Sequence, residues 1–148
     1  MNIPSVAQML PVLQTAIGPM ILISGLGLVL LTMTNRLGRT IDRVRILTAT
    51  LPAAAESKHA KVSAQLRILW RRARLIRTAI MLCAMSALAS AILIIVIFFT
   101  ALWQLEAASL IGALFILSML CLIGALIFVI LDINQSLMAL KLEMAVDE

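Results

Sequence analysis

The chain has 148 residues, of which 63% are hydrophobic and 13% are charged, with a formal net charge of +5 and a mean hydropathy of +1.12. Soluble domains carry about 45–50% apolar and roughly 25% charged residues, and a chain this short cannot hide so much apolar surface from water. This composition excludes an ordinary soluble enzyme, a disordered tail and a secreted disulfide scaffold, and it indicates a small membrane protein.

Charged residues divide the sequence into three apolar stretches. Residues 1–35, 78–105 and 107–131 carry no charged side chain, whereas eleven of the 12 Lys and Arg lie between Arg36 and Arg77. Each uncharged stretch contains the ~20 residues needed to cross the hydrocarbon core of a bilayer. The sequence therefore predicts membrane spans at 11–33, 78–102 and 107–131.

The first apolar stretch contains an internal Gly18-Pro19 pair. Proline removes a backbone hydrogen bond and clashes with the preceding turn, so we expect a kink near Gly18. Apolar residues upstream recur at helical spacing, which predicts an N-terminal interfacial segment over 1–17 that bends into the membrane. A secretory signal peptide is not expected, because no basic region precedes the apolar run.

The excess of Lys and Arg predicts the orientation in the membrane. Short loops rich in these residues remain on the cytoplasmic side, so the 34–77 segment and the C-terminus are expected inside and the N-terminus outside. The short connection after Leu102 predicts an antiparallel hairpin of the second and third spans.

In the basic segment 34–77 apolar residues recur at the three- and four-residue spacing of a helix, which a flexible linker would not show. It is expected to form a helical hairpin broken at Leu51-Pro52, since the residue before proline disfavours the helical region. The third span is expected to continue as a cytoplasmic C-terminal helix over 132–148. The predicted fold is a single all-α domain over 1–148, a polytopic membrane protein with three transmembrane helices prolonged into a cytoplasmic helical bundle. The apolar stripes expected to form the core of that bundle are Leu37, Ile41, Val44 and Leu47, then Val62, Leu66, Leu69, Ala73 and Ile76, and finally Ile133, Leu137, Leu140 and Met144.

Ionisable residues mark the predicted cytoplasmic edge of the hydrocarbon. Arg36 ends the first span, Arg77 precedes the second and Asp132 follows the third. A carboxylate at this depth requires a cationic partner. We expect Asp132 to pair with Arg36, Arg39 or Arg77 in the same chain or a neighbour; the alternative is that Asp132 meets water at the boundary.

The residues that carry chemistry are sparse. His59 is the one histidine, and no Cys, Asp or second His stands at metal-ligand spacing from it. Cys83 and Cys121 lie at different predicted depths, so no disulfide is expected between them. The sequence has no Gly-rich phosphate loop and no nucleophile–base set. We therefore expect no enzyme, no catalytic residue, no metal and no cofactor.

Arginines on the second cytoplasmic stem share one helical face next to a tryptophan. Such a surface suits anionic lipid headgroups or an acidic protein partner, although basic residues also serve simply to hold the loop inside. Nucleic acid is the weaker alternative, because clustered Arg is an unspecific electrostatic signal. The face comprises Arg67, Trp70, Arg71 and Arg74.

Small residues recur in all three spans and predict close helix contacts and a homo-oligomer. Two functional classes remain open. The favoured one is a non-enzymatic scaffold or accessory module; the alternative is an oligomeric, anion-favouring pore with an arginine-rich cytoplasmic mouth. The pore would be lined by Ser24, Gly25, Gly27, Thr32 and Asn35.

Several sequence blocks resemble those of a known family. They are Ala16-Ile17-Gly18-Pro19, Thr34-Asn35-Arg36-Leu37-Gly38-Arg39, Asp42-Arg43-Val44-Arg45 and Arg71-Arg72-Ala73-Arg74, followed by the acid after the third span. Together they resemble a bacterial inner-membrane family known as domain of unknown function 2721, from about Ile17 to Met144. Asp132 stands where the resemblance implies Glu. The resemblance implies a three-span protein of the bacterial inner membrane and no particular activity.

Overall fold

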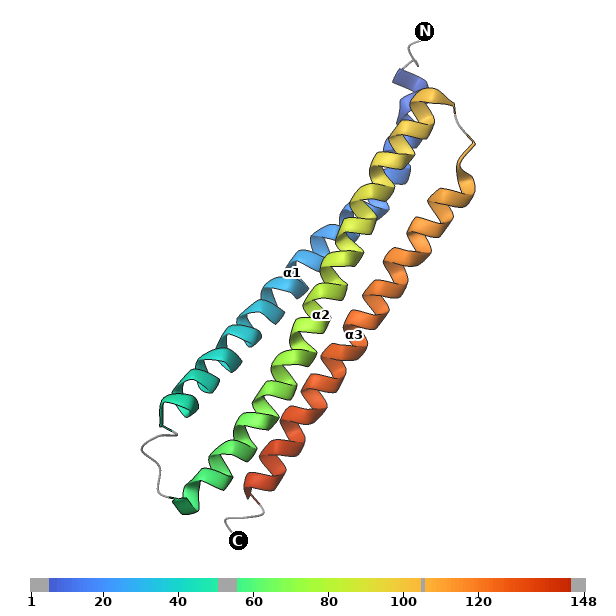
Figure 1. Cartoon of the computed structure of the whole chain (residues 1–148). Coiled ribbons are helices and arrows are strands. Elements are labelled where there is room, and N and C mark those ends of the chain that lie inside the picture. Colours follow the sequence, from blue (N-terminus) through green and yellow to red (C-terminus); the bar gives the residue numbers. More distant parts are fainter. Residues whose placement is uncertain (1–5, 51–55, 105, 145–148) are drawn as a thin grey trace. The chain divides into compact units, whose positions relative to one another are not determined.

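The structure is a computed structural model that describes residues 6–50, 56–104 and 106–144, with side chains described at 10–50, 59, 62–104 and 106–135. This part of the chain forms the α-helices α1 (Val6–Thr50), α2 (Glu56–Trp103) and α3 (Ala108–Met144), as shown in Figure 1. All three are long and apolar enough to cross a membrane. The chain is therefore an all-α, polytopic membrane protein.

Helix α1 ends where the sequence places residues that disfavour a helix. Helix α1 ends at Thr50, directly before Leu51-Pro52, and α2 begins at Glu56. No Gly or Pro interrupts the sequence between Glu56 and Trp103, so the basic stem and the second apolar stretch form one helix. Helix α3 likewise continues past Asp132 to Met144. The predicted prolongation of the apolar helices by helical stems is confirmed, and 145–148 lie outside the described residues.

Helix α1 extends further towards the N-terminus than a first span that starts at Pro11. Residues 6–17 belong to the same helix as the predicted span, and both Pro11 and Pro19 lie inside it. Each proline removes one backbone donor, but these losses do not end the helix. The Thr15 Oγ1 hydroxyl donates to the Pro11 carbonyl at 2.9 Å within this segment. Residues 1–5 of the predicted interfacial segment lie outside the described residues.

The chain divides into two compact units. Unit 1 comprises Met1–Leu30 and Leu82–Gly124, and unit 2 comprises Leu31–Met81 and Ala125–Glu148. Most of the apolar runs of α2 and α3 belong to unit 1, whereas all 12 Lys and Arg belong to unit 2.

In unit 1, α2 and α3 pack as an antiparallel pair. Ser86 of α2 contacts Ser118 of α3, while an added Cβ on Gly124 would lie 3.3 Å from Leu82 Cδ1. Lower numbers in α2 therefore match higher numbers in α3, which confirms the predicted hairpin. The Cys83 Sγ approaches the Leu26 carbonyl at 4.0 Å, so α1 also packs on α2 in this unit.

Three serine hydroxyls form a closed polar contact between α2 and α3. The Ser86 hydroxyl donates to the Ser118 carbonyl at 2.9 Å, and the Ser118 hydroxyl donates to the Ser86 carbonyl at 3.2 Å. The hydroxyls of Ser90 and Ser118 lie 2.7 Å apart. All three side chains are buried, so each hydroxyl is satisfied inside the protein, as the absence of water in a membrane requires.

The turn between α2 and α3 has one strained residue. Gln104 follows the last residue of α2 and has a φ of 52°. This left-handed conformation is usual for glycine after a helix and costs other residues roughly 1–2 kcal/mol. Helix α3 resumes with a hydrogen bond from the Ile111 amide to the Ala107 carbonyl.

The core of unit 2 contains buried polar residues as well as buried apolar ones. Leu69 and Ile76 of α2 are buried, which agrees with the predicted stripe of that stem. On α1 the stripe is displaced by one residue, because Thr40 is buried while Ile41 is 40% exposed. On α3, Asp132 is buried while Ile133 is 41% exposed. The predicted stripe residues Leu137, Leu140 and Met144 have side chains outside the described set.

Candidate functional site: a buried carboxylate and a basic groove

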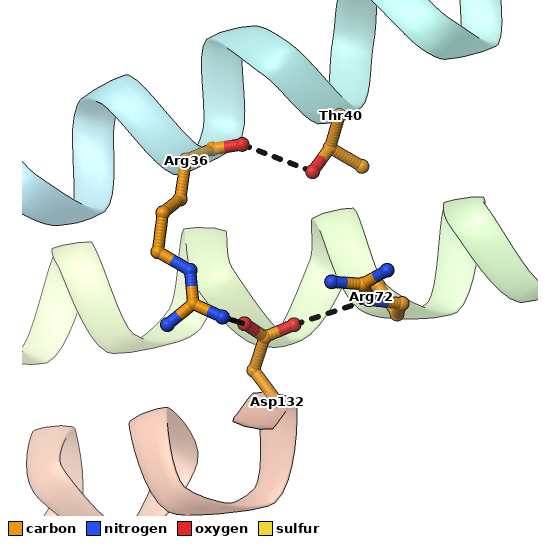
Figure 2. Close-up of polar contacts among 4 residues, drawn as sticks. All are labelled: Arg36, Thr40, Arg72 and Asp132. Atoms are coloured by element: carbon orange, nitrogen blue, oxygen red, sulfur yellow. Dashed lines mark hydrogen bonds and ion pairs between the residues drawn. The ribbon is translucent and has the colours of Figure 1, made fainter. Parts of the chain in front are cut away.

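Asp132 is a carboxylate enclosed by two arginines in unit 2. Its side chain is 1% exposed, and its Oδ2 lies 3.0 Å from Arg36 Nη2 of α1. Its Oδ1 accepts a hydrogen bond from Arg72 Nε of α2 at 3.5 Å. Figure 2 shows the carboxylate of α3 between the two guanidinium groups. One side chain therefore connects all three helices of the unit.

Helical spacing explains why these polar residues face inward. Arg72 lies three residues after Leu69 and four before Ile76, both of which are buried. Residues at these intervals share a helix face, so the face that packs the α2 stem also carries Arg72 towards Asp132.

On α1, Arg36 lies between Met33 and Thr40, which are also buried and share its face. The Thr40 hydroxyl donates to the Arg36 carbonyl at 3.0 Å, as Figure 2 shows. This bond satisfies the Thr40 hydroxyl inside the core, while the side chain of Arg36 contacts the carboxylate.

The cluster carries a net charge of +1. The Arg36 contact is an ion pair in which Asp132 Oδ2 accepts no hydrogen bond from the described residues. The arginine side chains are 25% and 21% exposed against 1% for the carboxylate. Burying a carboxylate away from water costs free energy unless the carboxylate is paired. Arg36 and Arg72 provide this pairing for Asp132. This arrangement connects α1, α2 and α3 through one buried carboxylate.

A basic groove lies elsewhere on α2. Arg67, Trp70, Arg71 and Arg74 line an open hollow of about 360 Å³. All four residues are exposed, and Trp70 is 60% exposed. Arg71 and Arg72 are neighbours in sequence but differ in role, because Arg72 contacts Asp132 and Arg71 lines the groove.

A known protein family matches most of the chain, including the Asp132 cluster and the basic groove. The model of the family described as "Protein of unknown function (DUF2721)" matches residues 16–142. The chain belongs to the DUF2721 family. No curated protein and no solved structure was found to match the chain. The predicted resemblance is thereby confirmed, and the match includes Arg36, the basic groove and Asp132.

In this DUF2721 protein the structure brings together part of the predicted ion-pair cluster. Arg36 contacts Asp132 within the same chain, as the spacing predicted, but Arg39 and Arg77 are exposed and form no ion pair with the described residues. Arg72, which the sequence pattern did not predict as a partner, also contacts Asp132. The signal that could have found it is its position between Leu69 and Ile76 on the predicted stripe.

The five predicted pore-lining residues of the DUF2721 chain share one property. All are exposed on α1 and lie away from the core of their own unit. An added Cβ on Gly25 or Gly27 would meet no atom within 4 Å. The residues are Ser24, Gly25, Gly27, Thr32 and Asn35.

Metal-ligating and thiol side chains lie apart from one another in the described part of this DUF2721 chain. They contain no group of three His, Cys, Asp or Glu side chains that could hold a metal ion. Cys83 and Cys121 are free thiols, and His59 is exposed.

Proposed function

We propose that this protein is a non-enzymatic, homo-oligomeric scaffold or accessory module of the bacterial inner membrane, whose basic cytoplasmic stems contact anionic lipid or an acidic partner. The observation that carries the proposal is the contrast between its polar groups. The buried carboxylate and the buried serines are engaged with neighbouring helices, whereas the arginines of the basic groove are exposed.

The orientation in this proposal rests on charge. Eleven of the 12 Lys and Arg lie between Arg36 and Arg77, and such segments remain on the cytoplasmic side of bacterial membranes. The N-terminus and the turn at Gln104 are then external. The basic groove faces the cytoplasmic leaflet, whose anionic lipids attract polybasic segments by about 1 kcal/mol per Lys or Arg.

The homo-oligomer rests on the exposed small residues of α1. In membranes, small residues gather where helices approach closely, because lipid supplies no hydrophobic force between helices. Gly25 and Gly27 have no neighbour within 4 Å of an added Cβ, and Ser24 is also exposed. Ser24 and Gly27 lie three residues apart and share a helix face, on which a second copy of α1 could pack closely, whereas Gly25 offers a close approach on another side of the helix.

The oligomer is tested by enlarging the glycines. A Cβ added at Gly25 or Gly27 would meet no atom of a neighbouring helix within 4 Å, so the Gly25→Leu/Gly27→Leu double variant should fold normally and become monomeric in detergent or nanodiscs. Ala84→Leu adds bulk at an exposed position of α2 and should leave the oligomer intact. A monomeric wild-type protein, or a double variant that still assembles, contradicts this arrangement.

A pore remains the second candidate because polar Ser24 and Asn35 are exposed on the same α1. Leu28 and Leu31 lie between them and are 70% and 60% exposed, so a pore along this face would have an apolar constriction. The scaffold therefore predicts no anion flux above empty vesicles in proteoliposomes. Flux that falls on Asn35→Leu substitution would favour the pore and overturn the scaffold.

A further inference from the structure

The basic groove holds three guanidinium groups without an acidic neighbour in its lining. Arg67, Arg71 and Arg74 line it together with Trp70. The ion pairs among the described residues involve Arg36 and Arg72 instead. The charge of the groove is therefore not neutralised by the described part of the chain, and the groove favours an anionic ligand.

The spacing of the groove residues suits a phosphate group. Positions 67, 71 and 74 follow each other at four and three residues on α2, which places neighbouring side chains about 5–6 Å apart at Cβ. Guanidinium groups bind phosphate oxygens through two parallel hydrogen bonds. Adjacent arginines at this distance can contact the same phosphate from two sides.

The position of the groove favours a lipid phosphate over a soluble one. The uncharged run of α2 begins at Thr78, so Arg74, Arg71 and Arg67 lie roughly 6, 10 and 16 Å from its start along the helix. The polar headgroup layer is about 5–8 Å thick on each side of a bilayer, so Arg74 lies within it, Arg71 reaches it by extending its side chain, and Arg67 lies on the aqueous side of the groove.

The indole of the groove supports the same assignment. Trp70 is 60% exposed among the arginines, and exposed tryptophans concentrate where headgroups meet water. Met81, one turn beyond Arg77, is 58% exposed in the uncharged run, where an acyl chain would lie. Inorganic phosphate would contact neither the exposed indole nor the exposed methionine.

We propose that Arg67, Trp70, Arg71 and Arg74 form a binding site for the phosphodiester headgroup of an anionic glycerophospholipid. This inference rests on the lipid-contacting part of the proposed function and names its ligand. It is independent of the oligomeric state, which depends on the exposed face of α1.

Trp70 itself can report the occupancy of the site. The chain has two tryptophans, so Trp103→Phe leaves Trp70 as the sole indole. The full-length variant is reconstituted in neutral phosphatidylcholine vesicles with a trace of phosphatidylethanolamine dansylated on its amine, which is an anionic lipid. Energy transfer from Trp70 to dansyl is then measured while unlabelled phosphatidylglycerol is added. We expect phosphatidylglycerol to displace the dansyl lipid, and neither phosphatidylcholine nor millimolar inorganic phosphate to do so.

Matched variants separate a site from diffuse attraction. Arg67→Gln/Arg71→Gln/Arg74→Gln, in the Trp103→Phe background, should weaken displacement at least tenfold. The control removes the same charge from three exposed arginines of α1 outside the groove and should weaken it less than threefold. Replacing the groove arginines by lysine keeps the charge but loses the planar fork, so at least a threefold loss is expected. The control is Arg39→Gln/Arg43→Gln/Arg45→Gln.

Three results would overturn the inference. Equal losses in the groove and control variants would mean nonspecific surface attraction, and displacement by inorganic phosphate would mean a site for soluble anions. Displacement by an acidic peptide at lower concentration than by phosphatidylglycerol would assign the groove to a protein partner. In each case, an unchanged oligomer in nanodiscs would leave the scaffold proposal standing.

Discussion

Replacing Asp132 by asparagine tests whether the buried carboxylate fastens the three helices of unit 2. Asparagine has nearly the same size, so the substitution removes charge without opening a cavity. Arg36 and Arg72, now 3.0 and 3.5 Å from the carboxylate oxygens, would then face each other without a counter-ion. We expect the protein to fold with lower stability.

The size of the loss follows from burial. Removing one partner of a buried ion pair costs about 3–5 kcal/mol, because the other charge remains desolvated. Here the arginine side chains keep 25% and 21% exposure, so water screens part of their repulsion. We expect a loss of ~3 kcal/mol, which corresponds to a decrease of roughly 6–12 °C in Tm for a chain of this size.

The assay is thermal unfolding in detergent, followed by helical circular dichroism, with two comparison variants. Asp42 is an exposed acid of α1 in the same unit and forms no ion pair with the described residues. Asp42→Asn should therefore shift Tm by less than ~2 °C. The triple variant Arg36→Met/Arg72→Met/Asp132→Leu removes all three charges and should regain most of the stability lost by Asp132→Asn.

The reasoning is refuted if Asp132→Asn unfolds within 2 °C of the wild type, or no lower than Asp42→Asn. A triple variant as unstable as the single one would also contradict it, because packing rather than the unneutralised charge would then be the cause.

The remaining predictions concern unit 1. Ser118→Ala removes the hydroxyl that contacts both Ser86 and Ser90, so it should lower the free energy of unfolding by about 1–2 kcal/mol. Ser24→Ala, at an exposed position, should leave the unfolding midpoint in detergent unchanged. Equal effects of the two variants would count against the serine contact. Gln104→Gly should raise Tm by roughly 2–4 °C because glycine adopts the φ of 52° without strain, and a lower Tm would show that no strain is stored there. Gly124→Leu should reduce the folded yield, since even a Cβ would lie 3.3 Å from Leu82 Cδ1, and a yield like that of Ala84→Leu would refute close packing at Gly124.

The helices and one ion pair were predictable because their signals are local. Leu51-Pro52 predicts the end of α1 at Thr50, and the absence of breakers predicts that α2 continues from the basic stem into the apolar run. Arg36 and Asp132 both stand at the edge of an uncharged run, so their similar depth follows from counting residues.

The packed faces near the membrane edge were less predictable. The stripe rule expects Ile41 and Ile133 to be buried, but the structure buries Thr40 and Asp132. The hydrophobic pattern is ambiguous there because lipid accepts apolar side chains as readily as a protein core does. At this edge the buried Thr40 and Asp132 mark the packed face better than Ile41 and Ile133 do.

The serine contact was missed for a related reason. The small residues of the spans predict close helix contacts, but not the hydrogen bonds that join Ser86, Ser90 and Ser118. Their hydroxyls pair only because α2 and α3 place them opposite each other. Register between helices depends on the whole hairpin and does not follow from either helix alone.

The central claim is that this DUF2721 protein assembles with itself and holds anionic lipid at its basic stem. Native mass spectrometry of the protein released from nanodiscs of phosphatidylcholine and phosphatidylglycerol tests this most directly. The account predicts an oligomer that retains phosphatidylglycerol, and retention that is lost when Arg67, Arg71 and Arg74 are replaced by glutamine while the oligomer persists. A monomer that carries no anionic lipid would contradict it.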